Sequence, residues 1–273
     1  MTHTGTNTWL LSRGGRVVVI DPGPDLPAHR AAILAALEPG ARVGAILVTH
    51  AHLDHSALVP SLAQATGAPV LAFGPEGTGQ SPLMARLAAQ GLGGGGEGLD
   101  LSFRPDERLA DGQTLRLGGL EIEALHTPGH SANHLAFACE GLLFSGDHAM
   151  GWASSLVSPP DGDMGAYMAS LRRLMERDWR RMLPGHGPEV EEPLTRLADL
   201  YRHRQTREAE VLAALAQGPA DAPRLARAIY RETPPALIPA AERNVLAHLL
   251  DLSDRNRVTT PAPLTARSVF ERI

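Results

Sequence analysis

The chain has 273 residues and a formal net charge of −5, and 43% of its residues are hydrophobic. This length is near the upper end of what one hydrophobic core supports, so we expect one catalytic domain with a small addition. No run approaches the roughly 20 apolar residues that span a bilayer, which excludes a membrane-spanning protein. The first residues, Met1–Gly5, lack a basic segment followed by an apolar one, so we expect no signal peptide and a cytoplasmic location.

Cysteine usage and charge narrow the chemistry further. Cys139 is the one cysteine, so an intrachain disulfide and a thiolate zinc cluster are both excluded. A net charge of −5 does not indicate a nucleic-acid binder. From Arg196 onward, however, 12 Arg face 9 Asp and Glu, which leaves −8 on residues 1–195. This basic C-terminal end weakly favours contact with nucleic acid.

The first 195 residues alternate short apolar runs with helical patterns, as in an α/β protein. The expected strands are Thr6–Leu11, Arg16–Ile20, Val43–Val48, Val70–Phe73, 114–117, 120–125, 135–139, 142–145 and Arg180–Leu183. The expected helices are 27–37, Pro60–Thr66, Pro82–Gln90 and 163–177, and Gly93–Gly96 is expected to form a surface loop.

Residues 196–273 differ, because strand signals nearly disappear. We expect helices over Leu197–Gln217, Ala222–Arg231 and within Pro235–Leu252, followed by a two-stranded wing of 257–260 and 267–270. Three helices and a hairpin are the outline of a winged-helix module. Such a module either binds nucleic acid or serves to pack or form a homodimer. We therefore divide the chain into a catalytic domain, 1–195, and a winged-helix-like domain, 196–273.

Ligand-type side chains are concentrated between a buried strand and a helix. His50, His52, Asp54 and His55 lie within six residues, in a strand-to-helix loop that a rigid scaffold can aim. His50 and His52 are two residues apart and can converge on one ion, whereas Asp54 and His55 favour a second. Imidazole and carboxylate are ligands of Zn²⁺. The cluster predicts a metal site rather than packing.

Three further segments place one ligand-type residue where a strand runs into a glycine-bearing turn. They contain His130, Asp147 and His186. Glycine at such points allows the backbone to approach a metal closely.

Together these motifs resemble the metallo-β-lactamase superfamily signature, H-x-H-x-D-H followed by His, Asp and His. The resemblance covers about residues 5–190 and implies a four-layer αββα sandwich. It assigns His50, His52 and His130 to one zinc ion, and Asp54, His55 and His186 to the other. It makes Asp147 the ligand that bridges both ions, and Asp21 a supporting residue.

The whole chain is similar to the branch of this family that contains β-lactamase-like protein 2. The matching segments are Gly5–Thr8, Tyr201–Arg204 with Arg207 and Glu208, and Asn244 with Leu246–Leu249. That branch includes an endoribonuclease with a small winged-helix-like tail and bacterial hydrolases of various substrates.

The resemblance implies a binuclear hydrolase in which a metal-bridging hydroxide attacks the substrate, with Asp54 as the catalytic carboxylate that orients it. Zinc is the expected metal, and manganese or iron are alternatives. His134, four residues after His130, is expected to support a ligand. Met150 and Trp152 either line the pocket or belong to the core.

Four functions follow from these observations. The first is hydrolysis of a small ester, thioester or lactone, which the acidic catalytic domain favours. The second is cleavage of single-stranded RNA, which the branch resemblance and the basic tail favour. A β-lactam hydrolase is a weaker alternative, because we expect no leader. A metal-free binding module is disfavoured by the complete ligand set.

Overall fold

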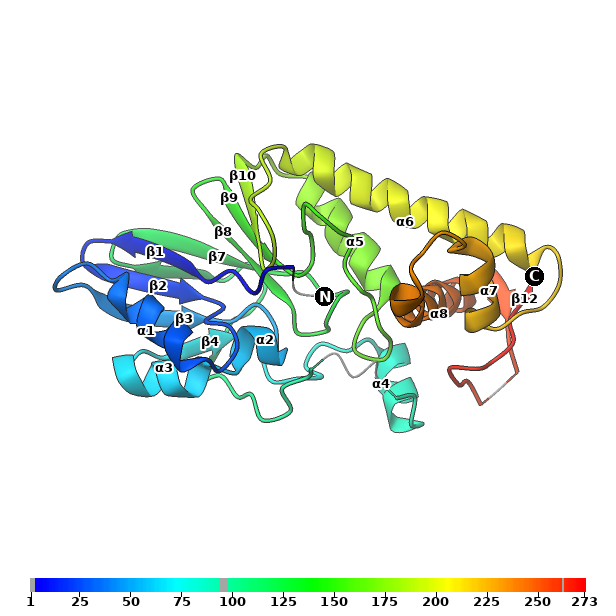
Figure 1. The fold of residues 1–273 in the computed structure, drawn as a ribbon, viewed down its shortest axis with the longest axis horizontal. Coiled ribbons are helices and arrows are strands. Elements are labelled where there is room, and N and C mark those ends of the chain that lie inside the picture. Colours follow the sequence, from blue (N-terminus) through cyan, green and yellow to red (C-terminus); the bar gives the residue numbers. More distant parts are fainter. Residues whose placement is uncertain (1–2, 94–97, 262) are drawn as a thin grey trace.

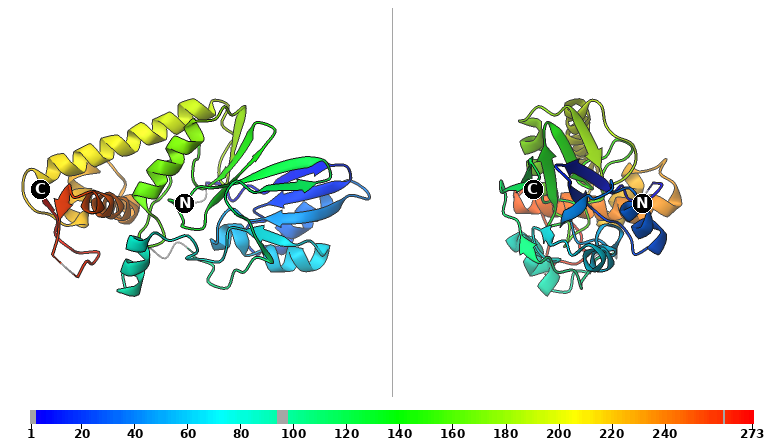
Figure 2. Two further views of the ribbon diagram at one scale, coloured as in Figure 1. Left: turned by 180° about the vertical axis from the view of Figure 1, so that it is seen from behind. Right: turned by 90° about the vertical axis from the view of Figure 1, so that its left-hand side faces the viewer.

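The computed structural model describes residues 3–93, 98–261 and 263–273. Two five-stranded sheets face each other, helices cover their outer faces, and a mostly helical module extends from one side (Figure 1). The two views in Figure 2 show the same arrangement from behind and from the side. This order of helices and sheets confirms the predicted four-layer αββα sandwich.

The first sheet is mixed and has the order β1-β2-β3-β4-β5. β1 and β2 are antiparallel, and the other neighbours are parallel. The strands are Trp9–Arg13, Arg16–Ile20, Arg42–Leu47, Val70–Ala72 and Glu107–Arg108, and the segment also contains helices α1 (Pro27–Ala35), α2 (Leu53–Ser56), α3 (Val59–Thr66) and α4 (Pro82–Ala89).

The second sheet has the order β10-β9-β8-β7-β6, with β9 and β10 parallel and the other pairs antiparallel. Its strands are β6 (Thr114–Leu117), β7 (Leu120–His126), β8 (Leu135–Cys139), β9 (Leu142–Gly146) and β10 (Arg181–Pro184), and α5 (Met164–Met175) precedes β10.

Alternation of buried side chains along each strand explains the layers. In β2, Val18 and Ile20 point into the core between the sheets, where Phe137 of the second sheet also lies. Val17 and Val19 face the other way and pack in the cluster that contains helix residues of α1 and α3. Because both faces are covered, β2 is a nearly continuous apolar run.

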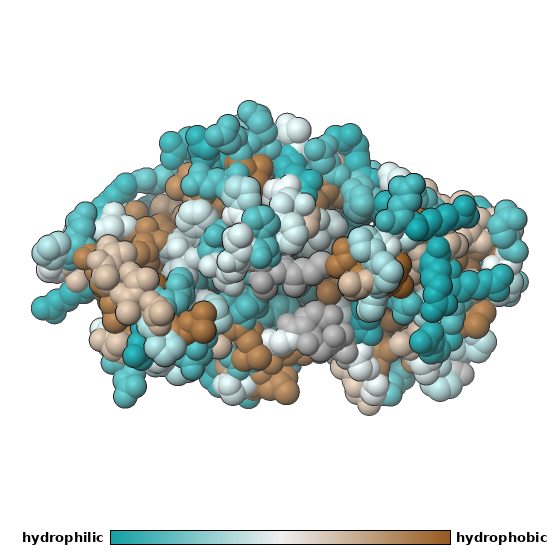
Figure 3. Space-filling model, in the orientation of Figure 1, coloured by the Kyte–Doolittle hydropathy of each residue, from teal (hydrophilic) through white to brown (hydrophobic). Residues whose placement is uncertain are grey.

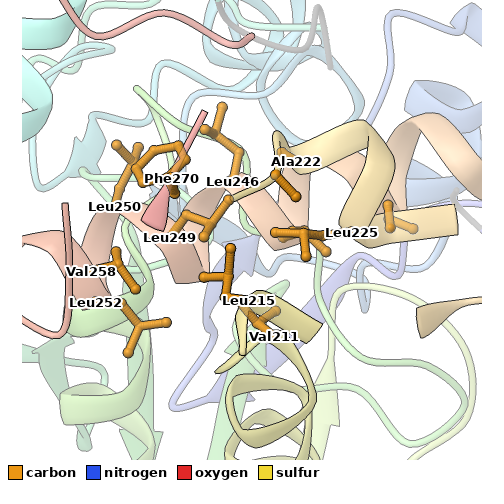
Figure 4. Close-up of a cluster of buried hydrophobic side chains, with 14 of the residues drawn as sticks. Val211, Leu215, Ala222, Leu225, Leu246, Leu249, Leu250, Leu252, Val258 and Phe270 are labelled. Atoms are coloured by element: carbon orange, nitrogen blue, oxygen red, sulfur yellow. The ribbon is translucent and has the colours of Figure 1, made fainter. Parts of the chain in front are cut away.

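The C-terminal module packs around a separate hydrophobic core (the module core), which also includes Met84 and Leu87 of α4 and is shown in part in Figure 4. Its elements are α6 (Pro193–Leu215), α7 (Ala222–Ile229), the 3-10 helix η1 (Pro235–Leu237), α8 (Ile238–Asp254), β11 (Val258–Thr259) and β12 (Glu271–Arg272). Helix α6 links both parts, because Leu197 and Leu200 pack with the second sheet while Val211 and Leu215 belong to the module core. The predicted division at residue 195 therefore lies within α6, and it stays a prediction.

The structure corrects two predicted strands. The first was expected over Thr6–Leu11 but covers Trp9–Arg13, because Thr6 and Asn7 pair with the segment after β10 instead. Thr6 forms a bridge with His186, and the backbone N–H of Asn7 donates to the Gly185 carbonyl. The second wing strand was expected over 267–270 but lies at Glu271–Arg272. Phe270 is instead fully buried in the module core.

Most of the predicted glycine loop, residues 94–96, lies outside the described residues.

One face of the molecule is mostly polar. On the face shown in Figure 3, hydrophilic side chains predominate and hydrophobic ones are scattered between them. No helix within the described residues has the length and hydropathy needed to cross a membrane.

Candidate metal centre

The structure brings all seven predicted ligand residues to one end of the two sheets. His50 and His52 follow β3, and Asp54 and His55 lie in the short helix α2. The other three residues follow strands of the second sheet: His130 comes after β7, Asp147 directly after β9 and His186 after β10. The strand ends of both sheets therefore converge on one site.

Three histidines form the first group. Nε2 of His50 lies 3.0 Å from Nδ1 of His52, and Nε2 of His130 lies 3.3 Å from the same nitrogen. All three ring nitrogens lie within 4.8 Å of one another. The three imidazoles are therefore close enough together to hold one ion.

A second group lies beside the first. Oδ2 of Asp54 is 3.3 Å from Nε2 of His186 and 3.7 Å from Nε2 of His55. Asp147 lies between the two groups, since its Oδ2 is 3.2 Å from Nε2 of His186 and 3.8 Å from Nε2 of His130. Asp147 also forms a group with His50 and His55, so the groups that could hold an ion overlap. The division of the seven residues between two ions, with Asp147 as the bridge, stays a prediction.

In each of the five histidines, one ring nitrogen faces the other ligand residues. The opposite ring nitrogen contacts a residue outside the two groups, and this contact fixes the orientation of the ring. The contacts are His50 Nδ1 with Thr49 Oγ1 (2.9 Å), His52 Nε2 with Asp161 Oδ2 (3.1 Å), His55 Nδ1 with Asp21 Oδ2 (2.9 Å), His130 Nδ1 with the Leu156 carbonyl (2.7 Å) and His186 Nδ1 with the Gly5 carbonyl (3.0 Å).

The two predicted supporting residues are buried next to ligand segments. Asp21 accepts hydrogen bonds from the backbone N–H and the hydroxyl of Thr49, both at 2.7 Å, in addition to the contact with His55. Nε2 of His134 accepts a 3.2 Å hydrogen bond from the backbone N–H of Asp147. Both residues therefore hold the backbone or side chain of a ligand residue.

Asp161 lies in the loop 158–162, which the sequence places at the border of the site, but its contact with a ligand residue was not predicted. Its Oδ2 faces His52, and its Oδ1 accepts a hydrogen bond from the Ser131 hydroxyl. Asp161 is 109 residues from His52 and follows two prolines in a loop, so no local spacing links them. The carboxylate within this Pro/Gly turn was the available signal.

Burial and neighbouring charges divide the site electrostatically. Burial, together with the charges of His55 and His52, holds the pKa of His50 well below its ordinary value, which favours the neutral, ligating imidazole. Burial alone would raise the pKa of Asp54, but the hydrogen bond with His186 and the charge of His55 lower it to about 2. Burial would lower the pKa of His186, but Asp147 and Asp54 raise it to about 9. The carboxylates thus lie in the second group, where they raise the pKa of His186, whereas the pKa of His50 in the first group is lowered.

Two buried side-chain atoms that lack a hydrogen-bond partner indicate whether the site suits a metal ion. Nε2 of His55 and Oδ1 of Asp147 are buried without a hydrogen-bond partner among the described residues, and they lie 3.5 Å apart. Such orphaned donors and acceptors are costly in a folded protein unless an ion or water satisfies them. The backbone also leaves room for the group, since a Cβ on Gly185 would lie 2.5 Å from Oδ1 of Asp147. The residues fit metal binding.

A pocket of about 400 Å³ opens over this site. His52, Asp54, His130, Asp147 and His186 line it at the metal groups. Met150 and Trp152, whose location the sequence left open, also line it, together with residues of η1 and α8. The chain therefore combines a potential metal centre with a largely apolar pocket.

Comparison with curated proteins gives two kinds of relatives. The chain is 32% identical to the Beta-lactamase-like protein 2 homolog of Drosophila melanogaster, over 94% of this chain and 85% of that protein. It is 30% identical to the Atrochrysone carboxyl ACP thioesterase of Aspergillus fumigatus, over 79% of this chain and 60% of that protein. The chain thus matches less than two thirds of the thioesterase.

Solved structures share the fold. A metallo-beta-lactamase family protein of Thermus thermophilus has a TM-score of 0.77 and 26% identity, covering 98% of this chain and 94% of that chain. A di-iron-bound form of a shorter protein has a TM-score of 0.53 and 34% identity, covering 69% of this chain and 91% of that chain.

Family models cover both parts of the chain. Residues 222–262 match the Beta-lactamase associated winged helix domain, which confirms the predicted winged-helix module. Residues 1–186 match the Metallo-beta-lactamase superfamily. The chain accordingly belongs to the metallo-beta-lactamase superfamily and is a hydrolase with His and Asp groups suited to metal ions.

Proposed function

We propose that the chain is a binuclear zinc-dependent hydrolase that cleaves small esters, thioesters or lactones. The observation that supports it is the pair of adjacent ligand groups with Asp147 between them, at the base of a small pocket. Imidazole and carboxylate donors suit zinc. Manganese and iron are the alternatives, and the di-iron form of one relative supports iron in that protein.

Residues of the chain have distinct roles in this proposal. When bound, the metal ions supply Lewis acidity and bring the pKa of water near neutral. Asp54 lines the pocket, its side chain is 31% exposed, and its low pKa keeps it ionised. It therefore accepts a hydrogen bond from the attacking water and passes a proton to the leaving group. Asp147 supplies negative charge between the two cation sites.

The lining of the pocket favours a small molecule over RNA as the substrate. Arg243 is the one Arg among its lining residues in the described part of the chain, and the chain contains no Lys. Binding of single-stranded RNA needs a basic groove along the backbone and aromatic platforms. Relatives that are named as thioesterases support a thioester in particular. The winged-helix match favours RNA as the second candidate.

The test uses zinc-replete protein with an acyl thioester, a labelled single-stranded RNA and a β-lactam. We expect thioester cleavage that EDTA removes and that His50→Ala abolishes, with secondary structure unchanged in circular dichroism. His203→Ala, in helix α6 away from the ligand groups, is the matched control and should keep the activity. Metal-dependent RNA cleavage without thioester cleavage would establish the second candidate, and equal activity of His50→Ala would contradict the metal centre.

A cytoplasmic location and a homodimer stay predictions.

A further inference from the structure

The pocket is built by two separate parts of the chain. The loop after β9 contributes Met150, Trp152 and Leu156. The opposite wall comes from the C-terminal module, where η1 and the start of α8 contribute the run Ala236, Leu237, Pro239 and Ala240. The polar groups on these two walls are the indole N–H of Trp152, the Ser154 hydroxyl and the Arg243 guanidinium, which donates to Ser158 and Pro159; the other side chains of the walls are apolar. The module thus forms half of a cavity whose floor is the metal centre.

Two large apolar side chains remain exposed in this cavity. Leu237 is 39% exposed and Trp152 is 38% exposed. Removing apolar surface from water stabilises a complex by about 25 cal/mol per Å², so an apolar ligand group gains affinity from both residues. The volume of about 400 Å³ lies within the range of small-molecule sites.

Hydrogen bonds fix the module wall relative to the metal centre. Oδ1 of Asn244, in α8, accepts a 3.1 Å hydrogen bond from the backbone N–H of Val157. Nε of Arg243 donates to the Ser158 hydroxyl at 2.9 Å, and the same guanidinium donates to the Pro159 carbonyl. Helix α8 is therefore attached to the loop opposite, and Leu237 is held at a defined position over the ligands. A held wall discriminates between substrates by size.

We propose that the C-terminal module determines the acyl specificity of this hydrolase, because Leu237 and Ala240 form the outer wall of a pocket for an uncharged, apolar acyl group. The inference rests on the proposed ester or thioester hydrolysis. Water attacks the acyl carbonyl at the metal centre, the C–S or C–O bond breaks, and the thiol or alcohol leaves with a proton. The acyl chain lies between Trp152 and Leu237 while this happens.

The first experiment measures kcat and KM of the zinc-replete protein with acyl thioesters of N-acetylcysteamine. The acyl groups are acetyl, butyryl, hexanoyl, octanoyl and the charged succinyl. We expect kcat/KM to rise with the length of the apolar chain and to be lowest for succinyl. In Leu237→Ala, the octanoyl-to-acetyl ratio should fall about tenfold, mainly through KM, as expected for lost apolar contacts. Ala240→Leu should shift the optimum to a shorter acyl group.

Leu194→Ala is the matched control. Leu194 lies in α6, does not line the pocket, and is 38% exposed, so the same truncation there should leave the acyl preference of the wild type. Equal rates for all acyl groups, a preference for succinyl, or equal effects of the two leucine variants would each overturn the acyl pocket while leaving the hydrolase intact.

A second measurement separates the pocket from the chemistry. The octyl thioether of N-acetylcysteamine cannot be hydrolysed, and its binding is followed by tryptophan fluorescence. Tighter binding to the wild type than to Leu237→Ala, without cleavage of any ester, thioester or lactone, would support the pocket and contradict the proposed function. Absence of both binding and cleavage would contradict both.

Discussion

Two clusters of buried polar side chains are the metal centre and a cluster at the junction of α5, α6 and α8. They differ in net charge and in whether their nitrogen and oxygen atoms converge on one point. In the metal centre, histidine nitrogens and carboxylate oxygens converge, and the outer nitrogen of each ring is held. At the junction of α5, α6 and α8, Arg204 lies over the Tyr167 ring. Its guanidinium donates to the neutral Asn244 side chain and Ser155 carbonyl, and both ring nitrogens of His248 are unpaired within the described residues.

The comparison shows that a buried unpaired atom does not by itself indicate a metal. The junction cluster carries the positive charge of Arg204, which disfavours binding of a metal ion. The metal centre instead contains the carboxylates of Asp54 and Asp147 beside its histidines. The junction instead supports the centre. Asn244 binds the N–H of Val157, and the adjacent Leu156 carbonyl holds His130. Removing groups from each cluster should therefore have different effects.

The largest effect is expected for Asp147→Ala, which removes the carboxylate between the two groups. The two groups then lack the anion that lies between them and offsets the charge of bound cations. We expect hydrolysis to fall at least about a thousandfold, which is about 4 kcal/mol in activation free energy, and the metal content to fall below two ions. Metal analysis after dialysis and thioester rates measure both. The exposed Asp25→Ala should change neither, and a fully active, fully loaded Asp147→Ala protein would contradict the bridging role.

A smaller effect is expected for Asn244→Ala in the junction cluster. The N–H of Val157 and the Arg204 guanidinium both lose an acceptor, and a buried unsatisfied donor costs about 1–3 kcal/mol. We expect a loss of about 2 kcal/mol in the free energy of unfolding, together with weaker metal binding at the His130 group only.

Denaturant unfolding and a chelator titration distinguish the two outcomes for Asn244→Ala. Gln205→Ala, on the exposed side of α6, is the matched amide control. If both metal ions were lost equally, or neither weakened, the proposed support of His130 through the loop would be wrong.

Asp161→Asn tests the support of one ligand without changing the shape of the side chain. The neutral amide is a weaker acceptor for the His52 ring N–H, so the opposite nitrogen becomes a poorer ligand. We expect metal affinity at the three-histidine group to fall about 10- to 100-fold, measured by competition with a chelator. The exposed Asp178→Asn is the control, and an unchanged affinity would show that Asp161 does not orient His52.

The sequence predicted the sandwich well because its strands are buried. β2 covers the predicted residues Arg16–Ile20, since a run of four β-branched residues leaves little choice of structure. It failed where the backbone pairs with a distant segment. The backbone N–H of Asn7 donates to the Gly185 carbonyl just after β10, and Phe270 pairs with Ala220 while its side chain enters the module core. Neither contact is visible in a local pattern.

The candidate site divides in the same way. His50, His52, Asp54 and His55 are close in sequence, so the cluster was evident before the fold was known. Asp161 and the Leu156 carbonyl are distant from the ligands they hold and lie in an irregular loop. The module's part in the pocket was also hidden, because Leu237 becomes part of the site only when α8 packs against that loop.

The smallest effect is expected from His248, whose ring is buried in the junction cluster. Burial, and then the charge of Arg204, lowers its pKa to about 3, against about 6.5 in an unfolded chain. Between these values the unfolded chain binds more protons, so stability is present above pH 6.5 and is lost as the pH falls toward 3. At pH 5.5 this loss is about 1.4 kcal/mol relative to pH 8.

In His248→Leu, the difference in unfolding free energy between these pH values should shrink by about that amount, as measured by denaturant titration of the zinc-replete protein. An unchanged pH dependence would mean that His248 does not remain neutral in the folded protein, and His29→Leu, in helix α1, controls for removal of a histidine elsewhere.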